Sequence, residues 1–188
     1  MTQSEPVHDP RVLRAIAHPV RNRILGEIGA AGSMRAADVA RELGIPANQA
    51  SFHLRQLAKY GLVEEAPDQA RDRRDRVWRA TSEKGLFINL SELEQAPGGK
   101  AAVGVYRSNA AAWSHLLVDR AFAAEKDEDT NRSVSESAVK LTKLEAAQLR
   151  EELDQVVERW IDRTKGRDDP VRRTYVLMQV LQPYPEDS

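Results

Sequence analysis

Six side chains between residues 47 and 60 carry groups suited to non-covalent recognition: two amides, a hydroxyl, an aromatic ring, a guanidinium and an ammonium. They are Asn48, Gln49, Ser51, Phe52, Arg55 and Lys59. Planar amides and guanidinium groups form paired hydrogen bonds with flat polar partners such as base edges, and cations attract phosphates. The chemistry open to this stretch is therefore recognition of a polar, anionic surface.

A helix is the element that would position these groups. At 100° per residue, Ala50, Leu54 and Leu57 lie within about 60° of one another, and most of the six recognition side chains lie on the opposite arc. His53 falls at the border, where we expect a packed or capping histidine. A single polar face is also typical of an ordinary solvated helix. Whether this helix binds a partner or is only solvated therefore has to be judged from the elements on either side of it.

The segments before this helix predict three more helices. Asp9 followed by Pro10 is typical of a helix start, and Pro19 interrupts that helix and begins the next one, which ends at Gly29 to Gly32. A third helix ends at Gly44, where a left-handed cap is expected, and Ile45 with Pro46 makes a tight turn. Helix, short turn and helix form a helix-turn-helix, in which the second helix offers a free face.

Two strands, 62–65 and 76–81, follow the helix and are joined by a polar loop, which predicts a hairpin and hence a winged helix-turn-helix. The loop is rich in arginine, partly offset by aspartate. A soluble turn is the alternative interpretation of such a loop. If the hairpin contacts DNA, phosphate contacts are expected from the following residues: Arg35, Lys59, Arg71, Arg73, Arg74 and Arg76.

The major groove of DNA is about 12 Å wide and accepts one helix, so the free face would contact base edges directly. Amides pair well with adenine, arginine with guanine, and an exposed phenylalanine with a thymine methyl. The predicted base-contacting residues are Asn48, Gln49, Ser51, Phe52 and Arg55. Docking of Phe52 against the carboxy-terminal half or a second subunit is an open alternative.

Residues 10–85 resemble the ArsR-type winged-helix regulators of bacterial transcription. The resemblance is carried by "LRAIAHPVRNRILGEI", by "ADVARELGIPANQASFHLRQLAKYGLVEE" and by "VWRAT". It implies that the helix 47–60 is a recognition helix and that the protein is a homodimer bound to a roughly palindromic operator. Ala47, Gln49 and Phe52 stand where the family often has serine, threonine or histidine, so the base preference of the family is not transferred.

We divide the chain into a winged helix-turn-helix DNA-binding domain (9–85), a linker (86–100), a dimerisation region (101–182) and a tail (183–188). A helix over 105–126, a strand over 136–141, a long helix that begins with the Thr142–Glu145 capping box, and a strand over 172–185 are expected in the second half. The predicted dimer interface consists of Tyr106, Trp113, Leu117, Leu149, Leu153, Val156 and Trp160. Packing of these side chains within their own subunit is the alternative.

The second half is longer than minimal members of the resembled family need, so it has room for a binding site for a small-molecule effector of unknown identity. Tyr106, Trp113, Trp160 and Tyr175 are candidate lining residues, although aromatic residues at helical spacing are more often core. His115 and Asp119 share a helix face, but two groups on one helix are not a metal site, and an ion pair or hydrogen bond explains them better. We therefore expect neither a metal nor another cofactor.

Composition narrows the class of protein further. The chain has 188 residues, 41% hydrophobic and 30% charged, and no cysteine, which excludes disulfides and thiolate chemistry. Neither a signal peptide nor a membrane-spanning run is recognisable, so we expect no membrane partner and a cytoplasmic location. Residues 1–85 carry 14 Lys and Arg against 11 Asp and Glu, whereas residues 86–188 carry 14 against 18. The basic surplus therefore belongs to the winged helix.

Phosphate-binding loops, nucleophile elbows and zinc-protease motifs are absent from the sequence, so we predict that the protein is not an enzyme. The fold class we expect is mainly α with a small β component, with an amino-terminal winged helix-turn-helix and a carboxy-terminal α+β dimerisation region. The predicted function is that of a homodimeric, sequence-specific transcriptional repressor whose partner is double-stranded DNA. The alternative is a winged-helix module for protein–protein interaction that has no specific DNA binding.

Overall fold

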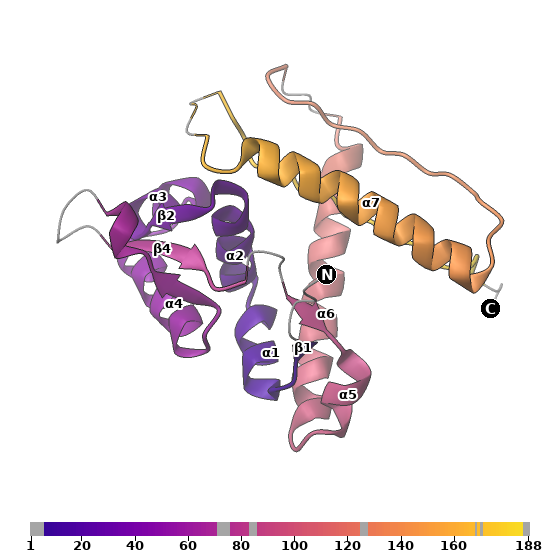
Figure 1. The fold of residues 1–188 in the computed structure, drawn as a ribbon, viewed down its shortest axis with the longest axis horizontal. Helices are drawn as coiled ribbons and strands as arrows, with labels where there is room; N and C mark the ends of the chain where they lie inside the picture. Colours follow the sequence, from indigo (N-terminus) through magenta and orange to yellow (C-terminus); the bar gives the residue numbers. More distant parts are fainter. Residues whose placement is uncertain are drawn as a thin grey trace.

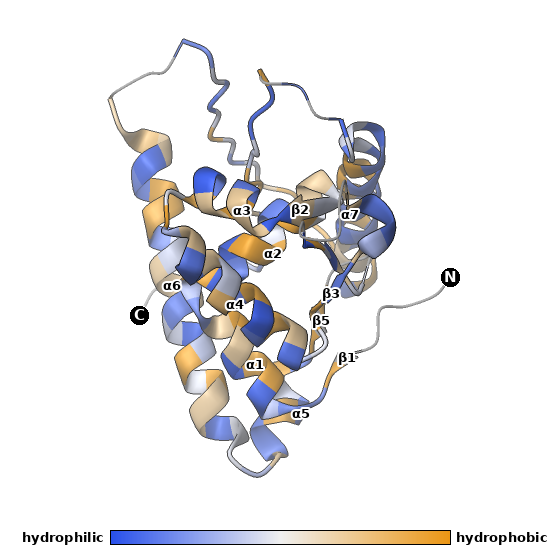
Figure 2. Cartoon of the chain, turned by 90° about the vertical axis from the view of Figure 1, so that its left-hand side faces the viewer, coloured by the Kyte–Doolittle hydropathy of each residue, from blue (hydrophilic) through white to orange (hydrophobic). Residues whose placement is uncertain are grey.

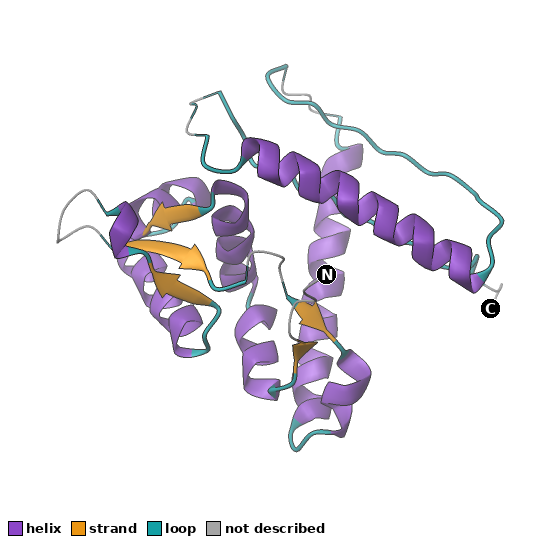
Figure 3. Ribbon diagram, in the orientation of Figure 1, coloured by secondary structure: helices purple, strands orange, loops and turns teal. Residues whose placement is uncertain are grey.

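The computed structural model describes residues 6–70, 76–82, 86–124, 128–167, 169 and 171–185, with the backbone alone at Pro6 and Phe87. The fold is mainly helical with a small β component, as predicted (Figure 3). The winged helix lies at one side of the molecule, and the long helices α6 and α7 lie at the other (Figure 1).

Four helices build the helix-turn-helix in the order that the sequence predicts. Helix α1 spans Pro10–Ala17, and the Asp9 carboxylate caps it by accepting a hydrogen bond of 2.8 Å from the Arg11 backbone nitrogen. Helix α2 spans Pro19–Ala31, α3 spans Ala36–Leu43 and α4 spans Ala47–Lys59. The left-handed cap predicted at Gly44 is present, with φ of 65°.

The wing is part of a three-stranded antiparallel sheet with the strand order β2-β4-β3. The hairpin strands β3 (Val63–Glu65) and β4 (Val77–Ala80) confirm the prediction, and a short 3-10 helix, Pro67–Gln69, follows β3. Strand β2, Ser33–Arg35, was not predicted; it pairs with β4 through Met34 and Trp78, both buried. The sheet fixes the wing to the start of α3.

The buried core continues from the winged helix into α6, Gly99–Phe122, which lies against α1. Segment 86–100, for which we predict a linker, holds strand β5 (Phe87–Ile88) and helix α5 (Leu90–Gln95). Strand β5 pairs in parallel with β1, Pro6–Val7. A Cβ atom added at Gly99 would lie 1.7 Å from the Leu93 carbonyl oxygen, so the tight α5–α6 corner requires glycine.

The largest fully buried side chains come from all these parts of the chain: Leu13, Ile24, Ile28, Val39, Leu54, Leu57, Val63, Leu93 and Val103. Beyond residue 103, by contrast, no described residue is fully buried. Helix α6 leaves the core halfway along its length, and its end at Phe122 is exposed. The carboxy-terminal part of the chain therefore depends on contacts other than a core of its own.

Helix α7, Lys143–Thr164, starts with the predicted capping box: Thr142 and Glu145 each bond the backbone nitrogen of the other. The strands predicted over 136–141 and 172–185 are wrong, since both described segments lie outside any sheet (Figure 3). They are rich in β-forming residues, but they have no pairing partner within the described chain. Among the described residues no helix has the length and apolar character to cross a membrane.

Two hydrogen bonds between described residues join the carboxy-terminal region to α2. The Gly166 backbone nitrogen donates a hydrogen bond of 3.1 Å to the Ala31 carbonyl. The Thr174 hydroxyl donates one of 2.7 Å to the Glu27 carboxylate. The extended segments are themselves linked where the Asn131 backbone nitrogen donates to the Tyr175 hydroxyl at 3.1 Å. The second half of α2 is thus one anchor point for the carboxy-terminal region.

Candidate nucleic-acid interface

Helix α4 buries one face and exposes the other. Ala50, Leu54 and Leu57 are 0% exposed and pack in the core between α2, α3 and β3, as the helical spacing predicts. On the outward face, Asn48, Gln49, Phe52, Arg55 and Lys59 are exposed and Ser51 is partly exposed. Phe52 is 49% exposed, which is high for an aromatic side chain in the middle of a helix.

Hydrogen bonds within the helix leave several of these groups free to bind a partner. The side-chain amide oxygen of Asn48, Oδ1, accepts a hydrogen bond of 2.9 Å from the Gln49 backbone nitrogen. The NH₂ of the same side chain remains the group that can donate outward. Within the described part of the chain, Arg55 has no hydrogen-bond or ion-pair partner. The Lys59 ammonium lies 5.9 Å from the centre of the Tyr60 ring, near the end of the helix.

Among the described elements, no later helix covers this face (Figure 2). In the view onto the winged-helix side, α4 lies uncovered, with both hydrophilic and hydrophobic residues along it (Figure 2). Helix α4 contains Arg55 and Lys59 but no acidic residue. Its outward face is therefore a convex, cationic surface with free donors, of the width that a major groove accepts.

In the described part of the wing, Arg76 and Arg79 are paired with carboxylates. Arg76 lies 3.5 Å from the Glu65 carboxylate, and Arg79 lies 2.8 Å from Glu64 and 3.7 Å from Asp68. All these groups are exposed, so the pairs are weak and Arg76 can exchange its partner for a phosphate at small cost. Arg71, Arg73 and Arg74 lie outside the described residues.

Arg35, another predicted phosphate contact, is half-buried at the junction of β2 and α3, opposite Val77 of β4. Arg35 therefore lies at the base of the wing. Its side chain or backbone also interacts with other residues of the chain. The wing sheet thus places Arg35 opposite Val77, the residue after Arg76, although Arg35 and Arg76 are far apart in sequence.

Behind the exposed face, two histidines meet. His53 of α4 is 6% exposed, and its ring centre lies 4.8 Å from that of His18, the residue between α1 and α2. The Nδ1 atom of each ring is buried without a hydrogen-bond partner. Burial lowers the pKa of both histidines, and the nearby Arg21 lowers it further. The neutral pair joins the α1–α2 junction to α4; no spacing in the sequence indicates this contact.

The predicted dimer residues separate into two groups in space. Tyr106 packs against the core, and Trp113 and Leu117 are half-buried on α6 beside α1. On α7, Leu149 is partly exposed, and Leu153, Val156 and Trp160 are 39%, 42% and 58% exposed. Of these two groups, only the α7 group presents an apolar surface that the described part of the chain leaves open.

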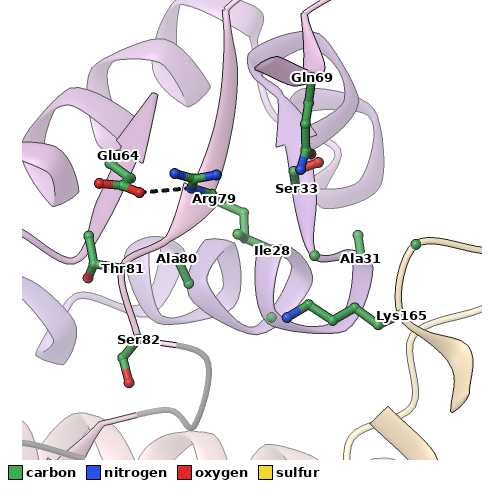
Figure 4. A pocket seen from close by; sticks show the side chains of 13 residues that line it. Ile28, Ala31, Ser33, Glu64, Gln69, Arg79, Ala80, Thr81, Ser82 and Lys165 are labelled. Atoms are coloured by element: carbon green, nitrogen blue, oxygen red, sulfur yellow. Dashed lines mark hydrogen bonds and ion pairs between the residues drawn. The ribbon is translucent and has the colours of Figure 1, made fainter. Parts of the chain in front are cut away.

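A polar cavity of about 650 Å³ lies where α7 ends against the winged helix. Figure 4 shows Glu64 and Arg79 directed toward each other across it and Lys165 extended along the end of α2. Lys165 lies against Gly32, and Gly166 bonds the Ala31 carbonyl. This arrangement is a junction between two parts of the chain, since its acid and its nearest guanidinium are already paired.

The described residues hold no cluster of three or more His, Asp or Glu side chains that could bind a metal ion, and the sequence has no cysteine. His115 and Asp119, which share a face of α6, are both exposed.

Residues 16–66, from the end of α1 to just beyond β3, match the family model described as "Helix-turn-helix domain". No curated protein matches the chain. Among solved structures, the chain is similar to a mutant MarR from E. coli, with 15% sequence identity, a TM-score of 0.35, and coverage of 78% of this chain and 85% of that chain. This likeness is too low to carry an argument. The chain therefore contains a helix-turn-helix domain, of the kind found in DNA-binding transcription regulators.

Proposed function

We propose that this protein is a sequence-specific, DNA-binding transcriptional repressor of the ArsR type, acting as a homodimer on a roughly palindromic operator in the cytoplasm, and that it is not an enzyme. The observation that carries the proposal is the outward face of α4. It is exposed and cationic, and its donors are free, whereas the opposite face of the same helix is anchored in the core.

In the proposed complex the residues divide by the chemistry of their contacts. Asn48, Gln49, Ser51, Phe52 and Arg55 discriminate bases, since amide, guanidinium and apolar groups each match a different base edge. The cations at the margins contact phosphates, which positions the helix without reporting sequence. Lys59 at the end of α4, and Arg35 and Arg76 at the wing, are suited to this second role.

A homodimer follows from two requirements. A single winged helix covers only about half an operator, and a twofold dimer separates two recognition helices by one DNA turn, about 34 Å. The exposed stripe of α7 is the surface we assign to the partner, because it has no buried side chain in the protomer. A helix of 22 residues with an uncovered apolar stripe gains its stability by packing on another surface.

The salt dependence of binding tests the proposal. Operator fragments selected from the host genome are mixed with the purified protein, and fluorescence anisotropy gives the dissociation constant at several salt concentrations. DNA binding through phosphates predicts that affinity falls steeply with salt, with a log–log slope of about −0.9 per phosphate contact, and that heparin competes.

The competing function is protein–protein docking through the same winged helix, favoured by the exposed Phe52. An apolar docking surface predicts neither a steep salt slope nor competition by a polyanion. Failure to select any genomic fragment, together with salt-independent binding of random DNA, would contradict the proposed function.

A further inference from the structure

A second cavity, of about 430 Å³, lies at the start of α2, whereas the polar junction lies at its end. The second cavity is partly open and is lined by the end of α1 and the start of α2, by the middle of α6, and by Val176 to Met178 of the carboxy-terminal segment. Its volume is within the range of small-molecule sites in proteins, roughly 300 to 1,000 Å³. Of the four aromatic residues that the sequence suggests for an effector site, Tyr106 and Trp113 line it, and Trp160 and Tyr175 do not.

The chemistry of the lining defines the class of ligand. Among the described residues, no Asp, Glu, Lys, Arg or His lines the cavity; most of the wall is aliphatic or aromatic, including Ile16, Trp113 and Leu117. An ion would lose its hydration there without gaining a charged partner, which is costly. The polar groups are the amides of Asn22 and Asn109 and the hydroxyls of Tyr106 and Ser114. The cavity therefore fits an uncharged, largely apolar molecule with one or two hydrogen-bonding groups.

One lining residue connects the cavity to the recognition helix. The Asn109 amide donates a hydrogen bond of 3.0 Å to the Ala17 carbonyl, at the last residue of α1. Ala17 and Pro19, which both line the cavity, flank His18, and the His18 ring contacts His53 of α4. A ligand that displaces the Asn109 amide or separates α1 from α6 would thus change the packing behind the DNA-binding face.

We propose that this cavity binds an uncharged, largely apolar small molecule and that occupancy is transmitted to α4 through Asn109, His18 and His53. The role of that molecule as an effector of DNA binding rests on the proposed function. Binding itself, and its effect on the histidine pair, do not.

A matched pair of fluorescent probes tests the ligand class. N-phenylnaphthylamine is uncharged, and anilinonaphthalene sulfonate has the same ring skeleton with an added anionic group. The full-length protein is titrated with each probe. Saturable binding of the neutral probe, at about one per chain and at least tenfold tighter than that of the sulfonate, is expected.

A matched pair of variants tests the location. Ala110 lines the cavity, whereas the neighbouring Ala111 is exposed and does not. Ala110→Phe fills the cavity and should weaken binding of the neutral probe at least tenfold, and Ala111→Phe should leave it within twofold. If Ala110→Phe does not fold, as shown by circular dichroism, Ala110→Leu is used in its place.

The histidine pair reports transmission without DNA. The chain has four histidines, so ring-labelled protein gives four resolvable imidazole signals. Addition of the neutral probe should shift the signals of His18 and His53 and leave that of His8, near the amino terminus, unchanged. Unshifted signals at probe saturation would contradict the transmission step.

Other outcomes also decide the proposal. Three results would overturn it: equal binding of both probes, probe binding that Ala110→Phe does not affect, and absence of saturable binding. Probe binding that appears only when the protein is diluted to monomers would show that a second copy fills the cavity, and would overturn it too. A protein that binds the probe as expected but no DNA would contradict the proposed function and leave the binding site standing.

Discussion

Helices α4 and α7 are both amphipathic, but the chain covers the apolar stripe of only one of them. In α4, Leu54 and Leu57 are 0% exposed. In α7, Leu153 is 39% and Trp160 58% exposed, and no residue of the helix is buried. The spacing of apolar residues in the sequence predicts both helices equally well, and it does not say what covers each stripe.

The difference shows which half of the protein has a buried core of its own within one protomer. The winged helix, together with α5 and the first half of α6, shares one buried core that holds the recognition helix in place. The region from α7 onward is joined to α2 by single hydrogen bonds, its Val176 to Met178 segment lines the cavity beside α6, and it leaves apolar side chains exposed. We therefore expect the first half to be stable on its own contacts and the second half to depend on a partner.

The same substitution in the two helices should have very different effects on stability. Leu54→Ala leaves a cavity in the core and should lower the free energy of unfolding by about 2 to 5 kcal/mol, independently of protein concentration. Leu153→Ala should cost far less in dilute protein, with an effect that grows as concentration rises, since it acts on association. Denaturant titrations at two protein concentrations measure both. Equal losses in dilute protein would show that α7 is part of the protomer's own core.

Charge placed on the α7 stripe should break the dimer. Val156→Glu would bury a carboxylate between two copies and should raise the dimer dissociation constant at least tenfold, about 1.4 kcal/mol. Gln155→Glu is the matched control, because it adds the same charge to the adjacent, exposed position on the other side of the helix. Sedimentation velocity gives both constants. A dimer that survives Val156→Glu unchanged would place the interface elsewhere.

Loss of a helix cap should likewise affect the stability of the two halves differently. Asp9→Ala removes the cap of α1, which packs in the core, and should lower the free energy of unfolding by about 1 kcal/mol. Thr142→Ala removes the cap of α7 and should reduce helicity there without moving the main unfolding transition. Far-ultraviolet circular dichroism and thermal melts read the two effects separately. A shift of the main transition by Thr142→Ala would link α7 to the core.

Acid should weaken the first half through its histidine pair. The pKa values of His18 and His53 are lowered from the ordinary 6.5 by burial, so below pH 6.5 the unfolded chain binds more protons than the folded one. The free energy of unfolding should therefore fall as pH drops below 6.5 and be flat above about 7 as far as these groups are concerned. His18→Asn should reduce that slope in urea titrations at several pH values. An unchanged slope would exclude the pair as its source.

Sequence patterns that span a few residues predicted the helix caps, turns and buried helix faces, because these features depend on residues close together in the chain. Asp9 with Pro10, the glycine at 44, the seam of α4 and the Thr142 capping box all depend on residues a few positions apart, and the structure contains each of them. The hairpin strands β3 and β4 were predicted for the same reason. The exposed residues of the candidate interface also followed, since helical spacing determines which side chains oppose a buried seam.

Contacts between distant segments could not be predicted in this way. Strand β2 exists because Met34 pairs with Trp78, 44 residues later, and the His18–His53 contact spans two helices. The segment 172–185 has strong β propensity but lies outside any sheet in the single chain, because strands form by pairing and propensity alone supplies no partner. The residues Arg71, Arg73 and Arg74 stay a prediction from sequence.

The most direct test of the DNA-binding face of α4 compares two alanine variants on two DNAs. Arg55→Ala and Lys59→Ala both remove one exposed cation from the same helix. Affinity is measured for the selected operator and for random DNA of equal length. Arg55→Ala should lose about 1 to 3 kcal/mol on the operator and much less on random DNA, whereas Lys59→Ala should weaken both alike and flatten the salt slope. Equal losses on both DNAs from Arg55→Ala would contradict the assignment of base recognition to this face.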